Sequence, residues 1–178
     1  MADQSVASQE PEFKPAERIQ RTAIHEAGHA VIGRVLKQVC GQASVQPSPD
    51  KGEVGHTITA DPYVTLGYWL DDLGRWRGRD SMVSIMRGRV MTYMAGRAAE
   101  EEFFGSCAGD DGDDQRQIDL MLDSLLPSGA DVPRYAQRLH DHTRTLVRRH
   151  RAAIACVAAL LVERGTLQSE EIERALAD

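Results

Sequence analysis

Apolar residues in the first quarter of the chain recur with the spacing of an amphipathic helix. They lie at i, i+4, i+7 and i+11, positions that share one face when a helix has 3.6 residues per turn. The residues of this face are Ile24, Gly28, Val31 and Val35. Pro15 suits the first turn, where its missing N–H breaks no hydrogen bond. The pattern predicts a helix from Pro15 to about Lys37 that buries this stripe, and it indicates close backbone packing, or room at a site, beside Gly28.

Two short segments with strand character follow, at residues 43–47 and 54–60. They flank residues 48–52, a stretch of proline, glycine, aspartate and lysine that is typical of a turn, so we expect a β-hairpin. Residues 61–75 are rich in aromatic residues and glycine. They predict a loop whose aromatic side chains pack against the domain, with the lining of a binding groove as the alternative.

Helical periodicity returns in the second half of the chain. The expected helices run from about Asp80 to Phe104, from near Asp114 onward, from Pro133 to about Arg164, and over residues 170–177. An acidic, glycine-containing connection at residues 105–113 separates the first two. Gly165 stands where a helix C-terminus favours glycine, and Ser169 caps the last helix. The predicted fold class is mainly α with a small β-hairpin or sheet.

Length and composition are those of one globular domain. The chain has 178 residues, of which 42% are hydrophobic and 27% charged. This is enough chain to bury a sizeable core. We expect a disordered tail at residues 1–14 and the domain at residues 15–178. The net charge of −6 gives no reason to expect nucleic-acid binding, for which a basic surface is typical.

The cysteines and the apolar runs of the sequence indicate the cellular compartment that we expect for the protein. The three cysteines are odd in number and show no C-x-x-C spacing, so a disulfide framework is not expected and a reducing cytoplasm is the natural compartment. The longest apolar run, at residues 152–162, is about half of the roughly 20 residues that a membrane span requires. The first twelve residues are polar and contain no apolar signal-peptide region.

Residues 25–29 read H-E-A-G-H, an H-E-x-x-H motif inside the first predicted helix. Residues four apart on a helix project from one face, so His25 and His29 can bind one zinc ion through neutral imidazoles. Glu26 flanks the same face, where its carboxylate can take a proton from a water molecule that the metal activates. The motif therefore predicts a zinc peptidase, and two solvent-facing histidines are the alternative.

Two motifs in the right order resemble one family. Residues 22–31, T-A-I-H-E-A-G-H-A-V, resemble the zinc helix of the FtsH-type peptidase domain. Residues 94–101, M-A-G-R-A-A-E-E, followed by Phe104 and Gly105, resemble the G-G-R-A-A-E-E…F-G helix of that family. The similarity extends over residues 17–176. It implies the FtsH-like peptidase fold, a protein or peptide substrate, and an edge strand at residues 54–60 that binds extended substrate.

One part of the family pattern is missing. FtsH-type proteins join the peptidase domain to an ATPase module and usually to membrane-spanning helices. This sequence contains no G-x-x-x-x-G-K-[ST] phosphate loop and no apolar span. We therefore expect a stand-alone peptidase domain without its own ATP site. The resemblance leaves a homo-oligomer or a separate ATPase open as partners.

A catalytic zinc needs a third protein ligand. Val35 stands where the extended metzincin motif places histidine, which excludes that class. The resemblance to the FtsH family implies an aspartate at the start of the helix after the A-A-E-E helix. With Ile118 at the family's small apolar position, this aspartate is Asp114. The family's Gly-Ala-Ser is replaced here by residues 109–112, G-D-D-G, so the neighbouring acids remain alternatives: Asp110, Asp111 and Asp113.

Three glutamates compete for the same role: Glu100, Glu101 and Glu102. A downstream glutamate is the third ligand in some zinc peptidases. One of these residues can instead accept a hydrogen bond from the far nitrogen of a ligand histidine, as such ligands usually require. Glu101 can also form an i,i+4 ion pair with Arg97. The remaining histidines, at positions 56, 140, 142 and 150, have no ligand spacing to one another.

These observations favour a zinc-dependent metalloendopeptidase. In this hypothesis His25, His29 and Asp114 bind Zn²⁺ and Glu26 is the general base. The alternative from another class is a catalytically silent metal-binding module that acts as an adaptor. Glu26 argues against it, because metal binding alone needs no base. A zinc hydrolase of non-peptide substrates is a third hypothesis.

Overall fold

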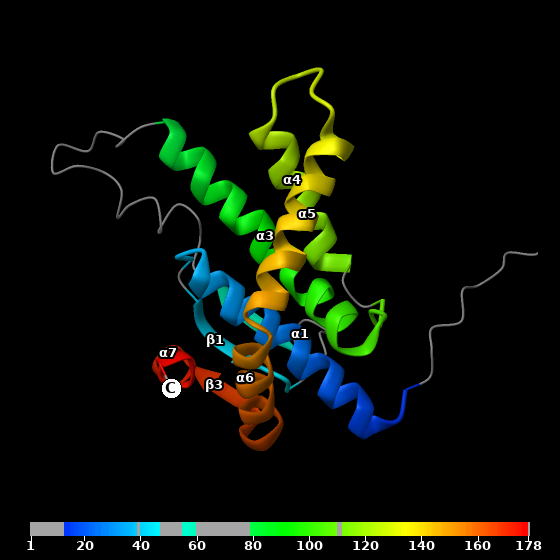
Figure 1. The fold of residues 1–178 in the computed structure, drawn as a ribbon, viewed down its shortest axis with the longest axis vertical. Helices are drawn as coiled ribbons and strands as arrows, with labels where there is room; N and C mark the ends of the chain where they lie inside the picture. Colours follow the sequence, from blue (N-terminus) through cyan, green and yellow to red (C-terminus); the bar gives the residue numbers. More distant parts are fainter. Residues whose placement is uncertain (1–12, 39, 47–54, 60–78, 110–111, 178) are drawn as a thin grey trace, which may run out of the picture.

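The structure, a computed structural model, describes most of the chain. The described residues are 13–38, 40–46, 55–59, 79–109 and 112–177. They form a mainly helical fold with one small antiparallel sheet, which confirms the predicted fold class (Figure 1). Residues 1–12 of the predicted tail, the turn at residues 48–52 and the aromatic loop at residues 61–75 lie outside the described part.

Helix α1 (Pro15–Val35) crosses α3 (Arg79–Phe104) at very close range. Both helices were predicted to within two residues of these bounds. A Cβ atom at Gly28 would lie 2.7 Å from the carbonyl oxygen of Ala95 and 2.9 Å from Cβ of Ala99. These distances are shorter than van der Waals contact, so only glycine permits this approach. Close backbone packing therefore explains the glycine inside α1.

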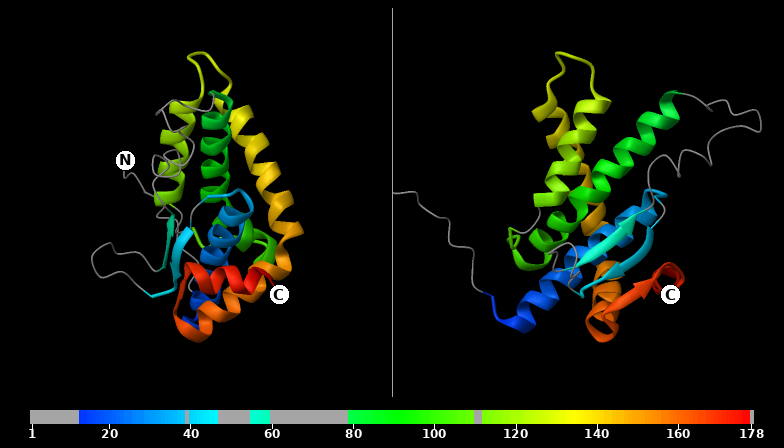
Figure 2. Two further views of the ribbon diagram at one scale, coloured as in Figure 1. Left: turned by 90° about the vertical axis from the view of Figure 1, so that its left-hand side faces the viewer. Right: turned by 180° about the vertical axis from the view of Figure 1, so that it is seen from behind.

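The middle of α1 is buried on every side. All residues from Glu26 to Gly33 are buried, because α3, α6 (Arg151–Arg164) and the sheet all pack against this helix (Figure 2). A single buried stripe that includes Val35 was expected. The prediction is wrong at Val35, which is exposed (37%). Burial in α1 depends on how far along the helix a residue lies, since the covering elements surround its centre and leave its last turn open.

The sheet has the strand order β2-β1-β3 and is antiparallel throughout. β1 (Cys40–Ser44) pairs with β2 (His56–Thr59), so the predicted hairpin pairing is confirmed, although β1 begins three residues before the expected segment. β3 (Thr166–Gln168) adds to the other side of β1 and was not predicted. Its three residues are too few to show a period. In the rear view of Figure 2 the sheet lies over α1, and its strands run roughly along the helix.

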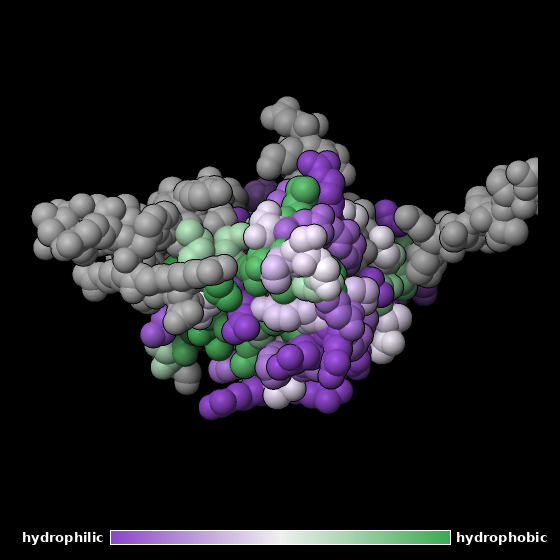
Figure 3. Space-filling model, turned by 90° about the horizontal axis from the view of Figure 1, so that it is seen from above, coloured by the Kyte–Doolittle hydropathy of each residue, from purple (hydrophilic) through white to green (hydrophobic). Residues whose placement is uncertain are grey.

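A second apolar cluster lies away from α1, between α3, α4 (Gly112–Leu125) and α5 (Val132–Arg149). Its buried members are Val90, Met91, Met94, Ile118, Leu122 and Leu139. α3 packs against both α4 and α5 (Figure 2). In Figure 3, which views the molecule from the end where α4 and α5 meet, hydrophilic side chains cover much of the described surface. No helix among the described residues is long and apolar enough to span a membrane.

The long C-terminal helix predicted from Pro133 to Arg164 is in fact two helices. α5 ends at Arg149 and α6 begins at Arg151, with His150 between them at φ −104° and ψ 19°. The expectation of one helix was wrong because tertiary packing divides the segment. α5 covers α3 and α4, whereas α6 covers α1, and the chain changes direction between them (left view of Figure 2).

The cap of the last helix also differs from the prediction. α7 (Ser169–Ala177) begins at Ser169 itself, and the side chain of Glu171 accepts a hydrogen bond from the backbone N–H of Gln168 at 2.9 Å. Ser169 is the first residue of the helix and not the residue before it, and its hydroxyl oxygen accepts a hydrogen bond from Arg34 of α1 at 2.5 Å. A contact with a distant helix therefore replaces the expected local one.

Candidate metal centre

Two helices bring three potential metal ligands together. His25 and His29 lie four residues apart on α1, and Asp114 lies in the first turn of α4. Oδ2 of Asp114 is 3.2 Å from Nε2 of His25 and 2.9 Å from Nε2 of His29. One potential ligand atom from each residue lies within 4.8 Å of the other two, so this group could hold a metal ion.

Hydrogen bonds at the far nitrogens fix both imidazole rings. Nδ1 of His29 is 2.7 Å from the backbone oxygen of Thr92, and Nδ1 of His25 is 2.7 Å from a carboxylate oxygen of Glu100. A carbonyl oxygen can only accept, so Nδ1 of His29 carries the proton. In the neutral ring Nε2 then has a free lone pair that faces Asp114. A carboxylate or carbonyl behind each histidine is the usual arrangement at metal sites.

Gly96 leaves the space in which an ion would fit. A Cβ atom at Gly96 would lie 2.5 Å from Nε2 of His25 and 2.5 Å from Nε2 of His29. A zinc–imidazole bond is only about 2.0–2.1 Å long. The volume that any other side chain would fill at this position is therefore close to the position that an ion bound by both histidines would occupy. The absence of a side chain on α3 supports a metal at this point.

Among the competing aspartates, the structure brings Asp114 to the histidines. Its side chain is 21% exposed, and its position in the first turn of α4 favours a negative charge. Asp113 is exposed and does not belong to the group. Asp110 and Asp111 lie outside the described residues.

The three glutamates of α3 have separate roles. Glu100, which is 5% exposed, lies behind His25 as the hydrogen-bond alternative describes. Glu101 pairs with Arg97 at 3.2 Å, and Glu102 pairs with Arg148 of α5 at 3.0 Å. None of them joins His25 and His29 in the group that could share an ion within the described structure.

Glu26 is buried beside the same group, with 5% of its surface exposed. The hydroxyl of Thr57 on β2 donates to its Oε2 at 2.6 Å. A Cβ atom at Gly55 would lie 2.5 Å from Cγ2 of Thr22 and 3.1 Å from Oε1 of Glu26, so glycine keeps this oxygen uncrowded. Sequence reasoning missed both contacts. The alternation of a strand, which turns residues 55 and 57 to the same face, was the available signal.

The charges around the histidines favour a cation at the centre. Burial lowers the pKa of His25, but hydrogen bonds to Asp114 and Glu100 outweigh burial and hold the pKa well above its ordinary value. Burial also lowers the pKa of His29, but the negative charge of Asp114 outweighs this effect, so the pKa is raised overall. Burial raises the pKa of Asp114, yet the two histidines hold it well below its usual range. A bound cation can take the place of the histidine protons.

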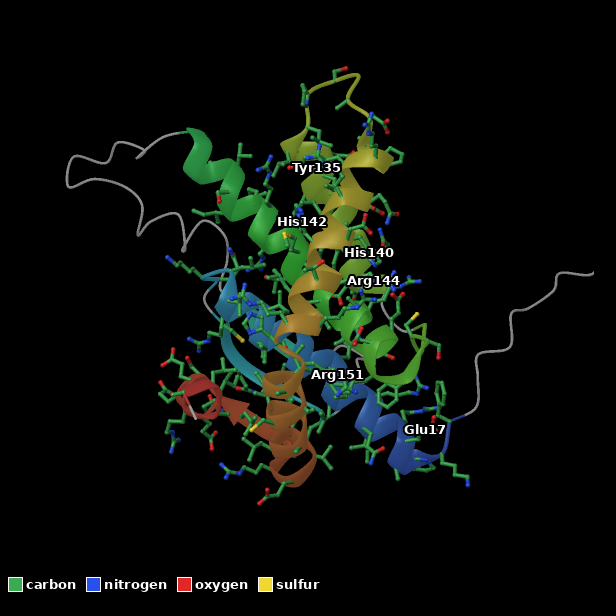
Figure 4. All side chains as sticks on the ribbon, in the orientation of Figure 1. Glu17, Tyr135, His140, His142, Arg144 and Arg151 are labelled. Carbon is green, nitrogen blue, oxygen red and sulfur yellow. The ribbon has the colours of Figure 1, made fainter. Side chains whose placement is uncertain are left out.

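A cavity of about 220 Å³ is lined by Asp114 and by other residues of α3, α4 and α5. Apolar side chains such as Met94 and Ile118 and polar ones such as Gln137 and His140 line it. Figure 4 labels His140 on α5. His140 is not part of the group that could hold an ion, in agreement with its lack of ligand spacing in the sequence.

No protein-family model matches the chain, and no curated protein matches it.

Proposed function

We propose that the protein is a zinc-dependent metalloendopeptidase. The observation that carries the proposal is the convergence of His25, His29 and Asp114 beside the buried carboxylate of Glu26. A metal site needs only the first three residues. A glutamate held at the same place by Thr57 is the additional group that hydrolysis requires.

The donor set supports zinc as the metal. Two imidazole nitrogens and one carboxylate oxygen are the protein ligands of many catalytic zinc sites, which keep a fourth position open. Calcium and magnesium prefer a shell made of oxygen ligands, so two histidines disfavour them. The space beside Gly96 and the orientation of both Nε2 atoms fit an ion of this kind.

The residues of the chain divide the chemistry between them. When bound, zinc supplies Lewis acidity, which polarises a carbonyl group and brings the pKa of a water molecule to about 7. Glu26 accepts a proton from the attacking water and returns it to the leaving amine. Thr57 holds Oε2 of Glu26 by a hydrogen bond, which leaves Oε1, beside Gly55, for proton transfer.

The substrate class follows from the resemblance and from the sheet. The H-E-A-G-H and A-G-R-A-A-E-E motifs resemble those of the FtsH-type peptidase family. β2 is an edge of the described sheet, and its residue Thr57 contacts Glu26. An extended peptide that adds to this edge would run beside the general base. This geometry supports an internal peptide bond as the target.

Replacement of Glu26 by glutamine tests the proposal directly. Zinc content, measured by elemental analysis, is expected to stay near one ion per chain, while cleavage of unfolded casein and short peptides falls by at least ~10²-fold. Glu163→Gln, an exposed change on α6, is the matched control and should retain activity. A wild-type protein that binds zinc but cleaves neither substrate would favour the adaptor alternative.

A further inference from the structure

Arg21 is a buried cation one helical turn before His25 on α1. Only 7% of its surface is exposed, although arginine is rarely buried unless its charge is compensated. Its Nε lies 3.4 Å from the carboxylate of Glu17 on the same helix. Neither helix formation nor the proposed chemistry of the H-E-x-x-H motif requires an arginine at this position. The reason for the burial of Arg21 must therefore lie in the contacts that its guanidinium group makes.

Two aromatic rings fix the plane of the guanidinium group. Its central carbon lies 4.1 Å from the ring centre of Phe13 and 4.4 Å from that of Phe104. Such contacts attract a cation electrostatically and suit the flat guanidinium better than an ammonium group. Phe104 is the last residue of α3, so the arrangement ties the N-terminal half of α1 to the end of α3.

The edge of the guanidinium group faces Glu100, the hydrogen-bond partner of the proposed metal ligand His25. Nη1 of Arg21 donates to the backbone oxygen of Ser106 at 3.1 Å and lies 3.9 Å from Oε2 of Glu100. The same Oε2 accepts a hydrogen bond from the backbone N–H of Ala108 at 2.9 Å. Oε1 of Glu100 is the atom that contacts Nδ1 of His25.

These contacts form one connected arrangement around Glu100. One of its oxygens faces His25, and the other faces Arg21 and the backbone of Ala108. Arg21 also holds Ser106, in the turn that precedes α4 and therefore Asp114 along the chain. A buried carboxylate needs compensation for its charge, and Arg21 supplies it.

We propose that Arg21 is a positioning residue of the metal centre, which it serves by holding Glu100 against His25 and by fixing the turn at residues 105–108. This inference rests on the proposed zinc site. Arg21 acts through other residues and touches neither the ion nor the substrate. Without it, Glu100 loses its charged neighbour and the ring of His25 loses its fixed orientation.

Arg21→Met removes the charge and the donors while it keeps an apolar stem. We expect zinc affinity, measured by competition with a chelator of known affinity, to fall by ~10–100-fold, the range for partners behind ligand histidines. Arg18→Met is the matched control, because Arg18 is exposed one turn earlier on the same helix. Its affinity should remain within about twofold of that of the wild type.

A double mutant separates positioning from a general loss of stability. Because Arg21 acts in part through Glu100, the loss of zinc affinity in Arg21→Met combined with Glu100→Gln should be clearly smaller than the product of the two single fold-losses. The visible absorption bands of the cobalt-substituted protein report ligand geometry. They should change alike in both single variants and stay unchanged in Arg18→Met. Thermal unfolding of the metal-free proteins shows whether each variant is folded.

The outcomes distinguish this inference from the proposed function. Wild-type affinity in folded Arg21→Met, or losses that add in full in the double mutant, would overturn the positioning role alone. A wild type that binds no zinc would overturn both. If Arg21→Met does not fold, Arg21→Lys decides: weaker zinc binding than in Arg18→Lys supports the role, and equal binding overturns it.

Discussion

Two regions of the molecule, the contact of α1 with α3 (the first half) and the group of α3, α4 and α5 (the second half), are packed by different means. Where α1 meets α3, the contacts are made by small residues such as Gly28, Ala95 and Ala99, and the backbones nearly touch. Between α3, α4 and α5 the buried side chains are large, including Met94 and Leu122. The first half contains both histidines and Glu26, and the second half supplies Asp114.

This difference indicates which region must hold its side chains in a precise geometry. Close helix contact holds the backbone behind each proposed ligand, so Nε2 of His25 and Nε2 of His29 can converge on a small volume beside Gly96 while their Nδ1 atoms keep their hydrogen-bond partners. Large side chains instead bury much apolar surface, which contributes free energy of folding. We therefore expect small changes in the first half to affect the metal, and loss of volume in the second half to affect stability.

The largest effect is expected from Gly96→Ala. The added methyl group would lie 2.5 Å from both Nε2 atoms, so zinc content should fall from about one ion per chain to nearly none. Far-ultraviolet circular dichroism should still show a helical protein. Gly112→Ala is the control, because its Cβ would meet nothing within 4 Å. Full zinc occupancy in Gly96→Ala would refute the position of the ion.

Asp114→Ala removes the proposed metal ligand that comes from the second half. Zinc affinity should fall by more than ~100-fold, beyond the range for residues behind a ligand. Asp113→Ala, an exposed neighbour, should leave affinity nearly unchanged. Titration with a competing chelator measures both. Equal losses in the two variants would mean that the acidic segment acts only through its charge.

Leu122→Ala tests the second half by loss of volume. Leu122 is 2% exposed, and its truncation should lower the free energy of unfolding of the metal-free protein by about 2–5 kcal/mol. Leu120→Ala, 55% exposed on the same helix, should change it by less than about 0.5 kcal/mol. Urea unfolding gives both values. If Leu122→Ala abolishes zinc binding in a folded protein, the two halves are not separable.

The smallest effect is a dependence on pH that reverses when zinc is added. The pKa values of His25 and His29 are raised above 6.5 in the fold, so their stabilisation is complete below pH 6.5 and is lost as pH rises through the raised values. The metal-free protein should therefore lose stability above pH 6.5. Zinc binds the neutral imidazoles, so stabilisation by zinc should increase over the same range. Urea unfolding with and without zinc measures both trends.

Much of the fold follows from local sequence. The period of α1, the extent of α3 and the hairpin pairing of β1 with β2 were predicted from spacing and turn residues, because these features depend on neighbours in the chain. The H-E-x-x-H spacing likewise determines that His25 and His29 share one face once α1 is a helix. The sequence by itself therefore determined two of the three proposed metal ligands and the place of the proposed base.

Tertiary structure alone decided the rest. Glu100 is 75 residues from His25 and Asp114 is 89 residues from it, and no local pattern reports contacts over such separations. The resemblance to a family pointed to Asp114, but the choice of Glu100 among three glutamates, and the presence of Thr57 beside Glu26, appear only when the elements pack. The break at His150 has the same origin, since one segment must cover two separate cores.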